Sequence, residues 1–443
     1  MDRVEIPSLA PVEATTAVRV TAVATRWLLR VAAFLVPLTE AGLQLSILGV
    51  FCLGLPYTLG RCRQAAHDAP ATRRPEMLVA VGLIGWLTLG LVAAMASGLT
   101  PRFSHVNKVL MAFAVLVGGL EVARQRDTEL RRLFVLTLCG TAVAVAVGLM
   151  QYFFGTFPGE KLLLGDYEGW RGQLYLAGTG YRAVTGTLLN RLKMAEALLF
   201  SGAALTAAIL TAHRKVVRWG GSVGLVGVTT GMYLTSVKAA MLSLGVGLVV
   251  VTLLSWRSWL HRVVPAGAVL LFVGGSLFVG YCVLTTLPLA HAPEGSFATR
   301  AWIWQHALTL FRERPWIGSG IGTYQVASGP IFNYEAGVWR TTAHNHHLTV
   351  LVEGGIIGFG LWMTACAGLV LGLRRCWSRS VEELTPGMVE LRLFATCFLV
   401  AIAVQSFLHD VLWHPGTAVM VWLCVGVVLA LGRQREPVAA GAA

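Results

Sequence analysis

Long apolar runs, separated by short basic connections, constrain the fold of this chain more than any other feature. A helix needs about 20 predominantly apolar residues to cross the hydrocarbon core of a bilayer. Candidate spans lie at 26–41, 43–60, 77–99, 107–123, 133–154, 189–212, 219–235, 239–255, 263–286, 346–373, 391–409 and 415–432. The sequence therefore predicts an all-α, polytopic integral membrane protein with about twelve transmembrane helices, forming a single membrane domain over residues 1–443.

The composition agrees with a membrane protein. Of 443 residues, 56% are apolar and 13% are charged, whereas a soluble domain carries about 25% charged residues. A water-soluble enzyme, a disordered chain, collagen and a coiled coil are thereby excluded. The eight cysteines lie in apolar runs or short basic loops without a CxxC pair, so they indicate neither a disulfide framework nor a zinc site.

The basic residues indicate how the chain is oriented. There are 35 Lys and Arg against 22 Asp and Glu, and the arginines gather on every second connection between the predicted spans. Cytoplasmic loops of membrane proteins carry such an excess. We therefore expect both termini in the cytoplasm, and we attribute the net charge of +13 to orientation rather than to a nucleic-acid partner.

Two long connections, 155–188 and 287–345, fall on the opposite, extracytoplasmic side. Loops of such length are usually functional or contain short helices of their own. In the longer one, the residues from Arg300 to Arg312 have helical spacing and Pro315 then ends the pattern. The Gly318-Ser-Gly-Ile-Gly322 stretch that follows is predicted to be a loop, not a phosphate-binding fingerprint.

Three cations are placed where an anion would explain them. Arg191 opens an apolar span, although a charge at the membrane edge can simply snorkel to the interface. Lys238 lies in a very short turn between the seventh and eighth predicted spans. Arg300 is near the start of the predicted external helix, where the helix dipole disfavours a cation. A solvated surface charge and a bound anion both remain open for these residues.

Three histidines, His344, His346 and His347, lie where the long loop re-enters the membrane as the tenth predicted span. No Asp, Glu or Cys stands within a few residues to complete a metal ligand set, so a metal site is disfavoured. Structural or interfacial roles remain open. We favour acid–base work, because histidine is the side chain whose ordinary pKa is close to neutrality.

At this point the motifs resemble those of a known family. His344-Asn345, followed after nine residues by Gly355-Ile-Ile-Gly358, resembles the signature of the O-antigen ligase and polymerase superfamily. Looser similarity extends over about residues 130–430, in Arg182-x-x-x-Gly186-x-x-x-Asn190, Thr235-Ser-Val-Lys238-Ala-Ala, Arg300-x-x-x-Trp304 and Pro315-x-x-Gly318-x-Gly320-x-Gly322.

The resemblance implies transfer of an O-antigen glycan from undecaprenyl diphosphate to lipid A–core oligosaccharide, at the periplasmic face of the bacterial inner membrane. It implies no cofactor, because the donor is already activated. By similarity His344 is the catalytic base on the long periplasmic loop, and Arg300 and Lys238 hold the donor diphosphate. The family more often has Arg at the position of Lys238, so Arg191 and Arg182 are alternative holders of part of the diphosphate.

Other functions stay open at this stage. An O-antigen polymerase or a protein O-oligosaccharyltransferase of the same superfamily would differ in its acceptor. A metal-dependent glycosyltransferase would need acidic residues on the external loops, where Glu40 and the Asp166-Tyr-Glu168 pair are the candidates. A non-enzymatic carrier of lipid-linked glycans would need charges at mid-membrane depth, and Glu353 is the exception in spans otherwise nearly free of charge.

Overall fold

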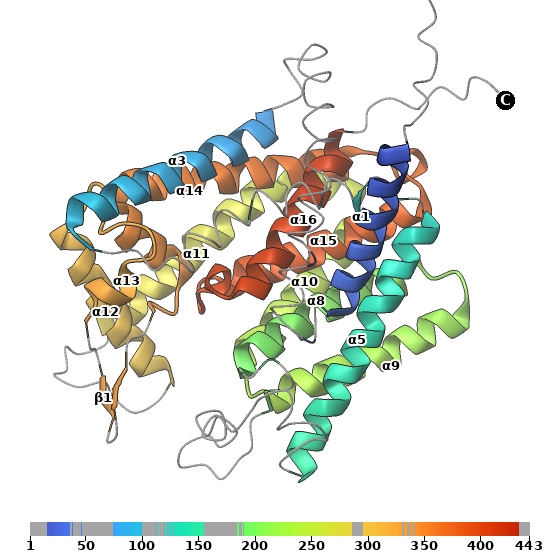
Figure 1. Ribbon diagram of the computed structural model, residues 1–443, viewed down its shortest axis with the longest axis horizontal. Helices are drawn as coiled ribbons and strands as arrows, with labels where there is room; N and C mark the ends of the chain where they lie inside the picture. The colour runs from blue at the N-terminus through green and yellow to red at the C-terminus, as the bar shows by residue number, and fades with distance from the viewer. Residues whose placement is uncertain are drawn as a thin grey trace, which may run out of the picture.

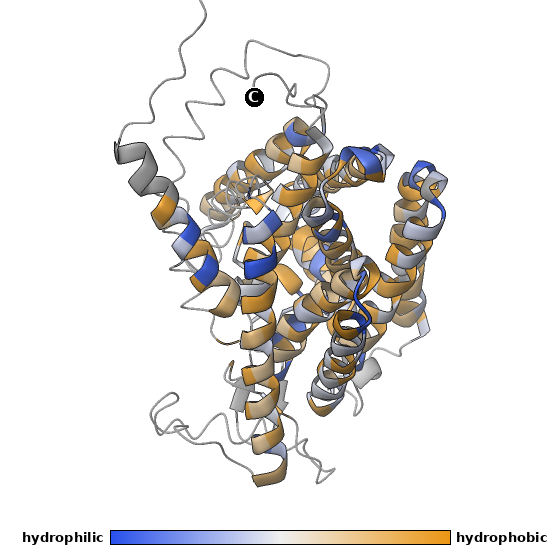
Figure 2. Ribbon diagram, turned by 90° about the vertical axis from the view of Figure 1, so that its right-hand side faces the viewer, coloured by the Kyte–Doolittle hydropathy of each residue, from blue (hydrophilic) through white to orange (hydrophobic). Residues whose placement is uncertain are grey.

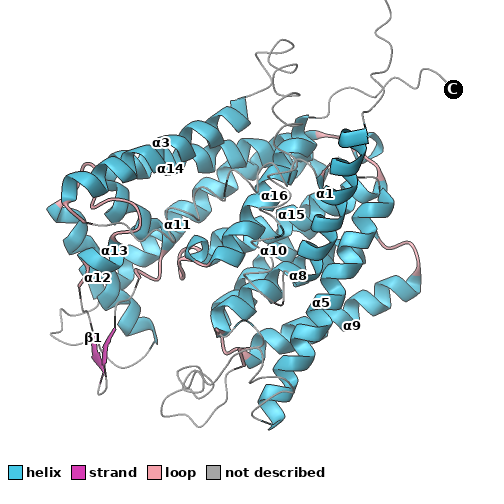
Figure 3. Cartoon of the chain, viewed as in Figure 1, coloured by secondary structure: helices cyan, strands magenta, loops and turns pink. Residues whose placement is uncertain are grey.

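The computed structural model describes residues 16–35, 74–99, 127–154, 190–285, 296–329, 332–334, 337–339 and 342–433, with isolated positions between them. Helices make up nearly all of this part of the chain, so the predicted all-α class is confirmed in its main feature (Figure 3). The exception is an antiparallel hairpin of β1 (Phe332–Tyr334) and β2 (Gly337–Trp339), which lies within the 287–345 segment.

The helices follow one another along the chain with short connections. The first are α1 (Thr16–Leu35), α3 (Arg74–Ser97) and α5 (Asp127–Phe154). The next are α8 (Arg191–Thr211), α9 (Lys215–Leu234), α10 (Lys238–Trp256), the 3-10 helix η3 (Ser258–Val263) and α11 (Val264–Thr285). The remainder are α12 (Ser296–Glu313), α13 (Tyr324–Ala327), α14 (His346–Ser378), η4 (Val381–Glu383), α15 (Pro386–Gln405), η5 (Val411–Trp413) and α16 (Pro415–Arg433).

Seven helical segments in the described part of the chain are long and apolar enough to cross a membrane. They fall in α3, α5, α8, α10, η3 with α11, α14 and α15, and the hydropathy colouring shows that the helices consist largely of apolar residues (Figure 2). Of the twelve predicted spans, 43–60 and 107–123 lie essentially outside the described residues, and each of the others overlaps a helix. The chain is thus a multi-pass membrane protein, while the number of twelve crossings stays a prediction.

Glycines allow the closest helix contacts. α3 lies along α14, as Figure 1 shows. A Cβ added to Gly82 on α3 would meet the Leu361 carbonyl oxygen at 2.5 Å, and one on Gly368 of α14 would meet the Pro75 carbonyl oxygen at 2.6 Å. Small residues let helix backbones approach in this way inside a membrane, where packing replaces the hydrophobic effect as the main attraction.

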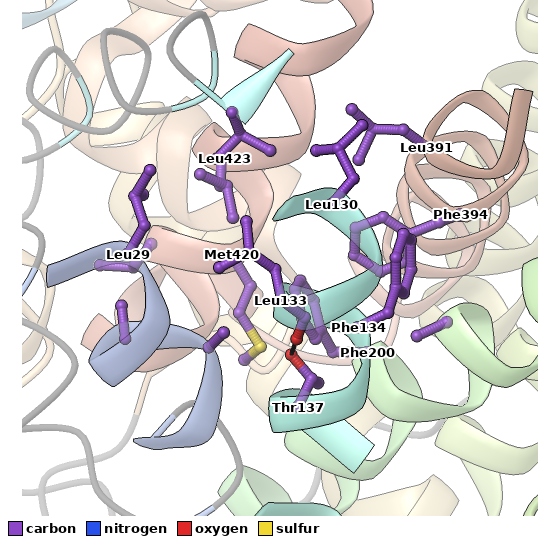
Figure 4. A pocket seen from close by; sticks show the side chains of 15 residues that line it. Leu29, Leu130, Leu133, Phe134, Thr137, Phe200, Leu391, Phe394, Met420 and Leu423 are labelled. Atoms are coloured by element: carbon purple, nitrogen blue, oxygen red, sulfur yellow. Dashed lines mark hydrogen bonds between the residues drawn. The ribbon is translucent and has the colours of Figure 1, made fainter. Parts of the chain in front are cut away.

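α15 occupies the centre of a second group of helices and packs against α8, α10 and α16. Phe200 of α8 stacks edge-on against Phe394 and Phe398 of α15, with ring centroids 4.8 and 5.1 Å apart. A cavity of about 70 Å³ lies between α1, α5, α8, α15 and α16 (Figure 4). Thr137 is the one polar side chain among its lining residues, so this cavity offers no catalytic groups.

α14 is broken at Gly355, and the loop that follows α12 enters the break. Gly355 has φ +60° and ψ −165°, a conformation that only glycine adopts readily. The break frees two carbonyl groups on its N-terminal side. The amide N–H of Ser319 donates to the Val352 carbonyl at 3.0 Å, and that of Gly320 donates to the Glu353 carbonyl at 2.8 Å.

The other side of the break is paired in the same manner. Ile356 N–H donates to the Pro315 carbonyl at 2.8 Å, and Ile357 N–H donates to the Trp316 carbonyl at 3.1 Å. A Cβ on Gly355 would lie 2.4 Å from the Trp316 carbonyl carbon. We call this contact between residues 315–322 and the break in α14 the glycine joint. It fixes α12 and the loop that follows it relative to the start of α14, where His344 lies.

Candidate active site

His344 lies immediately before α14 and is held from both sides. Its φ is +48°, in the left-handed region that histidine tolerates better than most residues. Trp304 of α12 donates its indole N–H to the Ala343 carbonyl at 3.0 Å. Asn345, the N-cap of α14, accepts the Leu348 N–H at 3.1 Å and donates to the Phe407 carbonyl at 3.1 Å. His344 is therefore fixed between α12 and the connection from α15 to α16.

That connection, residues 406–414, brings further titratable groups to His344. The rings of His344 and His409 have their centroids 6.2 Å apart at right angles. Asp410 accepts a hydrogen bond at 2.5 Å from the hydroxyl of Thr349, one turn into α14. His414 ends the connection, and its charge acts on both His344 and His409.

Two arginines complete the arrangement. Arg300 of α12 has its Nη2 atom 3.4 Å from Nε2 of His409. Burial lowers the pKa of Arg300, and the nearby Arg191 at the start of α8 lowers it further. We name the group formed by Arg191, Arg300, His344, His409, Asp410 and His414 the His–Arg cluster.

Burial, together with the charges of the His–Arg cluster, sets the protonation state of His344 and His409. Burial lowers the pKa of His344, Arg300 and His414 lower it further, and Asp410 opposes them. Burial and the neighbouring cations lower the pKa of His409 well below its usual range. Both imidazoles are thus neutral near pH 7. A neutral imidazole next to two guanidinium groups can accept a proton while the guanidinium groups bind an anion.

Several buried polar atoms near the cluster lack a protein partner in the described part of the chain. They are Nδ1 of His409, Oδ2 of Asp410 and the hydroxyl of Tyr324. Burial raises the pKa of Tyr324, with contributions from Asp410 and Glu353, so this side chain remains a neutral phenol. Buried polar groups in folded proteins are nearly always hydrogen-bonded, so these atoms mark a place where a ligand or water is expected.

The residues predicted from the sequence divide into three groups. Arg300, His344 and Arg191 lie together in the cluster. Lys238 is exposed at the first position of α10, and within the described ranges it forms no hydrogen bond or ion pair. Arg182 lies outside the described residues. The functional roles of all five stay predictions.

Sequence reasoning missed the contribution of the α15–α16 connection. His409, Asp410 and His414 stand within six residues in a short turn between two apolar spans, and that density of titratable groups was the available signal. The histidines nearest to His344 in sequence are placed differently. His347 accepts or donates a hydrogen bond at 2.9 Å with Ser406, and His346 packs on Trp362 with ring centroids 5.0 Å apart. No group of three metal-ligating side chains is present among the described residues.

Comparison with known proteins supports the resemblance seen in the sequence. Residues 222–363 match the family model described as O-antigen ligase, and this range includes Lys238, Arg300, His344 and the glycine joint. A search of curated proteins found no match. The resemblance to the O-antigen ligase family is thereby confirmed. It points to a glycosyltransferase-like membrane enzyme with lipid-linked glycan substrates.

Proposed function

We propose that the protein transfers an O-antigen glycan from undecaprenyl diphosphate to lipid A–core oligosaccharide. The observation that carries the proposal is the His–Arg cluster, in which Arg300 acts on a neutral His344, lies beside His409 and is itself near Arg191. The departing group of such a donor is a diphosphate. Guanidinium groups bind phosphate oxygens with paired, charge-assisted hydrogen bonds, and fixed charges in a site of low dielectric stabilise a leaving anion well.

The reaction is a single displacement with inversion at the anomeric carbon. His344 takes the proton of the acceptor hydroxyl while the acceptor oxygen forms its bond to the anomeric carbon. The bond from that carbon to the diphosphate oxygen breaks on the opposite face, and its electron pair leaves with the diphosphate. Arg300 and Arg191 neutralise this charge, with Lys238 and Arg182 as further candidates.

Asp410 supports the base in this scheme. Its carboxylate acts on His344 by raising its pKa, and therefore stabilises the imidazolium that forms as the proton is transferred. The Thr349 hydroxyl holds Oδ1 of Asp410, which fixes the carboxylate relative to the first turn of α14. Neither ATP nor a metal ion is required, because the glycosyl diphosphate is an activated donor.

The proposed orientation follows from the basic loops. Both termini face the cytoplasm of the bacterial cell, and the cluster faces the periplasm in the inner membrane. Residues 1–443 form one membrane domain, with a smaller periplasmic loop at 155–188 and a larger one at 287–345 that supplies Arg300 and His344. A non-enzymatic carrier would need a charge at mid-membrane depth, and Glu353 was the candidate for it. The Glu353 carboxylate instead accepts the Tyr324 N–H at 3.0 Å. This contact favours an enzyme over a carrier.

A transfer assay tests the proposal. The purified full chain is mixed with undecaprenyl diphosphate-linked glycan and lipid A–core acceptor in excess EDTA, and the products are separated on a gel. We expect glycan-capped core lipid in the presence of the chelator. Longer lipid-linked glycan without capped core would show a polymerase instead, and donor binding without any transfer would show a carrier. Either of these results contradicts the proposed ligase.

A further inference from the structure

The apolar cavity between α1, α5, α8, α15 and α16 takes no part in the mechanism above (Figure 4). The one hydroxyl among its lining side chains, that of Thr137, donates to the Leu133 carbonyl at 3.0 Å. No lining side chain therefore has a polar group in need of a partner. Apolar cavities in proteins stay free of water and accept apolar ligands. The contents expected here are hydrocarbon.

The cavity extends from one end of the helix bundle toward its middle. Leu130 lies in the first turn of α5 and Leu391 in the second turn of α15, while Phe200 and Leu423 line the cavity from the middle of α8 and α16. Three of these helices, α5, α8 and α15, are long and apolar enough to cross the membrane. On the proposed orientation, the first turns of α5 and α15 face the cytoplasm. The hydrocarbon at this depth is the acyl chains of the cytoplasmic leaflet.

Arginines stand next to the lining residues of α1 and α5. Arg30 follows Leu29, which lines the cavity, and donates to Glu129 through Nε and Nη2 at 2.5 and 2.8 Å. Arg132 donates to the same carboxylate through Nη1 at 3.2 Å. Two guanidinium groups thus share one carboxylate, so these three residues together carry a net charge of +1.

Arg132 is the most accessible member of this group. Its side chain is 63% exposed, against 22% for Arg30 and 9% for Glu129. A guanidinium group has five N–H bonds, and the contact with Glu129 uses one of those on Arg132. α1 has no acidic residue, and it adds the exposed Arg26 and an exposed Trp27, whose ring centroid lies 5.0 Å from Cζ of Arg30. A basic helix with an exposed tryptophan is typical of the membrane interface.

The acids at this end of the molecule lie toward α15. Asp127 accepts the Thr385 hydroxyl at 2.6 Å, at the start of α15. Glu390 of α15 is acted on by the charges of Arg131 and Asp127. The positive excess among the described residues is therefore on the α1 side of the cavity.

We propose that the cavity and these arginines bind an anionic phospholipid of the cytoplasmic leaflet. Part of one acyl chain lies in the cavity, and the phosphate lies against Arg132 and Arg30. Basic pockets between transmembrane helices on the cytoplasmic side bind anionic lipid head groups in the same way. The choice of leaflet rests on the proposed orientation, while the site itself does not depend on glycan transfer.

Native mass spectrometry of the purified full chain in detergent tests this site without requiring turnover. The probes are phosphatidylglycerol, which is anionic, and phosphatidylcholine, which has no net charge, with identical acyl chains. Arg132→Gln removes an exposed charge and leaves the ion pair between α1 and α5 in place. Ala33→Leu extends a larger apolar side chain from α1 into the cavity. Arg218→Gln is the matched control, because Arg218 is an exposed arginine of α9, a helix that does not line the cavity.

We expect the wild type to bind phosphatidylglycerol more tightly than phosphatidylcholine. Arg132→Gln weakens binding of phosphatidylglycerol by about fivefold, the contribution typical of one cation near an anionic lipid, and leaves binding of phosphatidylcholine unchanged. Ala33→Leu weakens binding of both lipids alike, by about fourfold for each methylene group that it displaces. Arg218→Gln binds both lipids as the wild type does.

Three results would overturn the assignment. An unchanged preference for phosphatidylglycerol in Arg132→Gln, or an equal loss in Arg218→Gln, would place the head group elsewhere. Unchanged binding of both lipids in Ala33→Leu would show that no acyl chain enters the cavity. Ala204→Met fills the same cavity from α8 and replaces Ala33→Leu if that variant does not fold. A wild-type chain that retains neither lipid, for example because a second copy covers this side, likewise contradicts the proposal.

Failure of the proposed function is distinguishable from these results. The assay measures lipid binding alone, so a chain that binds phosphatidylglycerol in the expected manner but transfers no glycan contradicts the ligase and not the lipid site.

Discussion

The two ends of the segment from His344 to Gly358 are built on different principles. At the first end, a histidine with left-handed backbone meets cations and an acid from three other parts of the chain. At the second end, Gly355 breaks α14 and backbone groups alone join the helix to residues 315–322. The same short motif therefore combines a group suited to chemistry with a joint suited to positioning. Changes at the first end should affect turnover, and changes at the second should affect folding.

The His–Arg cluster and the glycine joint each contain a buried acid, and these two acids differ in their hydrogen bonding. Asp410 in the His–Arg cluster keeps one buried carboxylate oxygen without a partner among the described residues. Glu353 at the glycine joint accepts the backbone N–H of Tyr324 and so starts α13. A carboxylate that caps a helix has a structural task, whereas one with an unused buried oxygen remains available to act on a neighbouring imidazole. Both acids are buried, so the degree of burial alone does not distinguish the structural acid from the one near the imidazole.

The largest effect on turnover is expected from His344→Asn. Asparagine tolerates the left-handed backbone of this position, so the fold should be kept while the proton acceptor is lost. General-base catalysis typically contributes roughly 10²–10⁴-fold, and we expect glycan transfer to fall by an amount in that range. The measurement is the rate of formation of capped core lipid. A folded His344→Asn variant that transfers glycan at the wild-type rate would contradict the assignment of His344 as the catalytic base.

The next largest effect is expected at the glycine joint and concerns stability. In Gly355→Ala the new Cβ meets the Trp316 carbonyl group, and the backbone conformation is one that alanine avoids. We expect the free energy of unfolding to drop by about 3 kcal/mol. A fall in thermal unfolding temperature, measured in detergent, checks this.

Gly360→Ala provides the matched control in the same helix, because a Cβ at Gly360 has no neighbour within 4 Å. Alanine should make α14 slightly more stable at that position. If both variants unfold at the same temperature, the joint contributes nothing to stability. The claim that the Gly355 end of the segment serves folding would then be contradicted.

The sequence predicted most of the helices and part of the candidate site, but it did not predict which connections meet at that site. The apolar runs predicted the long helices because a helix in a membrane must be apolar over its length, and the helix around Arg300–Arg312 was predicted from its spacing. Arg300 was singled out because a cation is disfavoured near the start of a helix, and His344 because its ordinary pKa is close to neutrality. His409, Asp410 and His414 were not recognised, since only the folded chain brings the α15–α16 connection against the start of α14.

The glycine motifs illustrate a second limit of the sequence. Gly318-Ser-Gly-Ile-Gly322 was correctly predicted to be a loop, and Gly355 and Gly358 were noticed as part of the family signature. The partner of each motif was not predictable, because hydrogen bonds between a loop and a broken helix leave no periodic pattern. In the structure the two motifs are each other's partner.

The smallest effect on the transfer rate is expected from Asp410→Asn. This variant tests most directly whether the His–Arg cluster and the glycine joint have separate roles. Because the Asp410 charge raises the pKa of His344, its removal should lower that pKa further. The base stays neutral to lower pH, so the acidic limb of the rate profile should move to lower pH. Transfer at pH 7.5 should fall by at most roughly tenfold for each unit by which the pKa of His344 is lowered, because the proton is only partly transferred in the transition state. The measurement is the pH dependence of the transfer rate.

Glu353→Gln is the control for Asp410→Asn, since it removes a second buried carboxylate that belongs to the glycine joint. The amide oxygen of Gln can still accept the Tyr324 N–H, although without its charge, so we expect a loss of roughly 1 kcal/mol in stability and an unchanged pH profile. A shift of the acidic limb in Glu353→Gln as large as that in Asp410→Asn would mean that the two acids act on His344 alike. The joint would then belong electrostatically to the catalytic site, and the separation between chemistry and positioning would not hold.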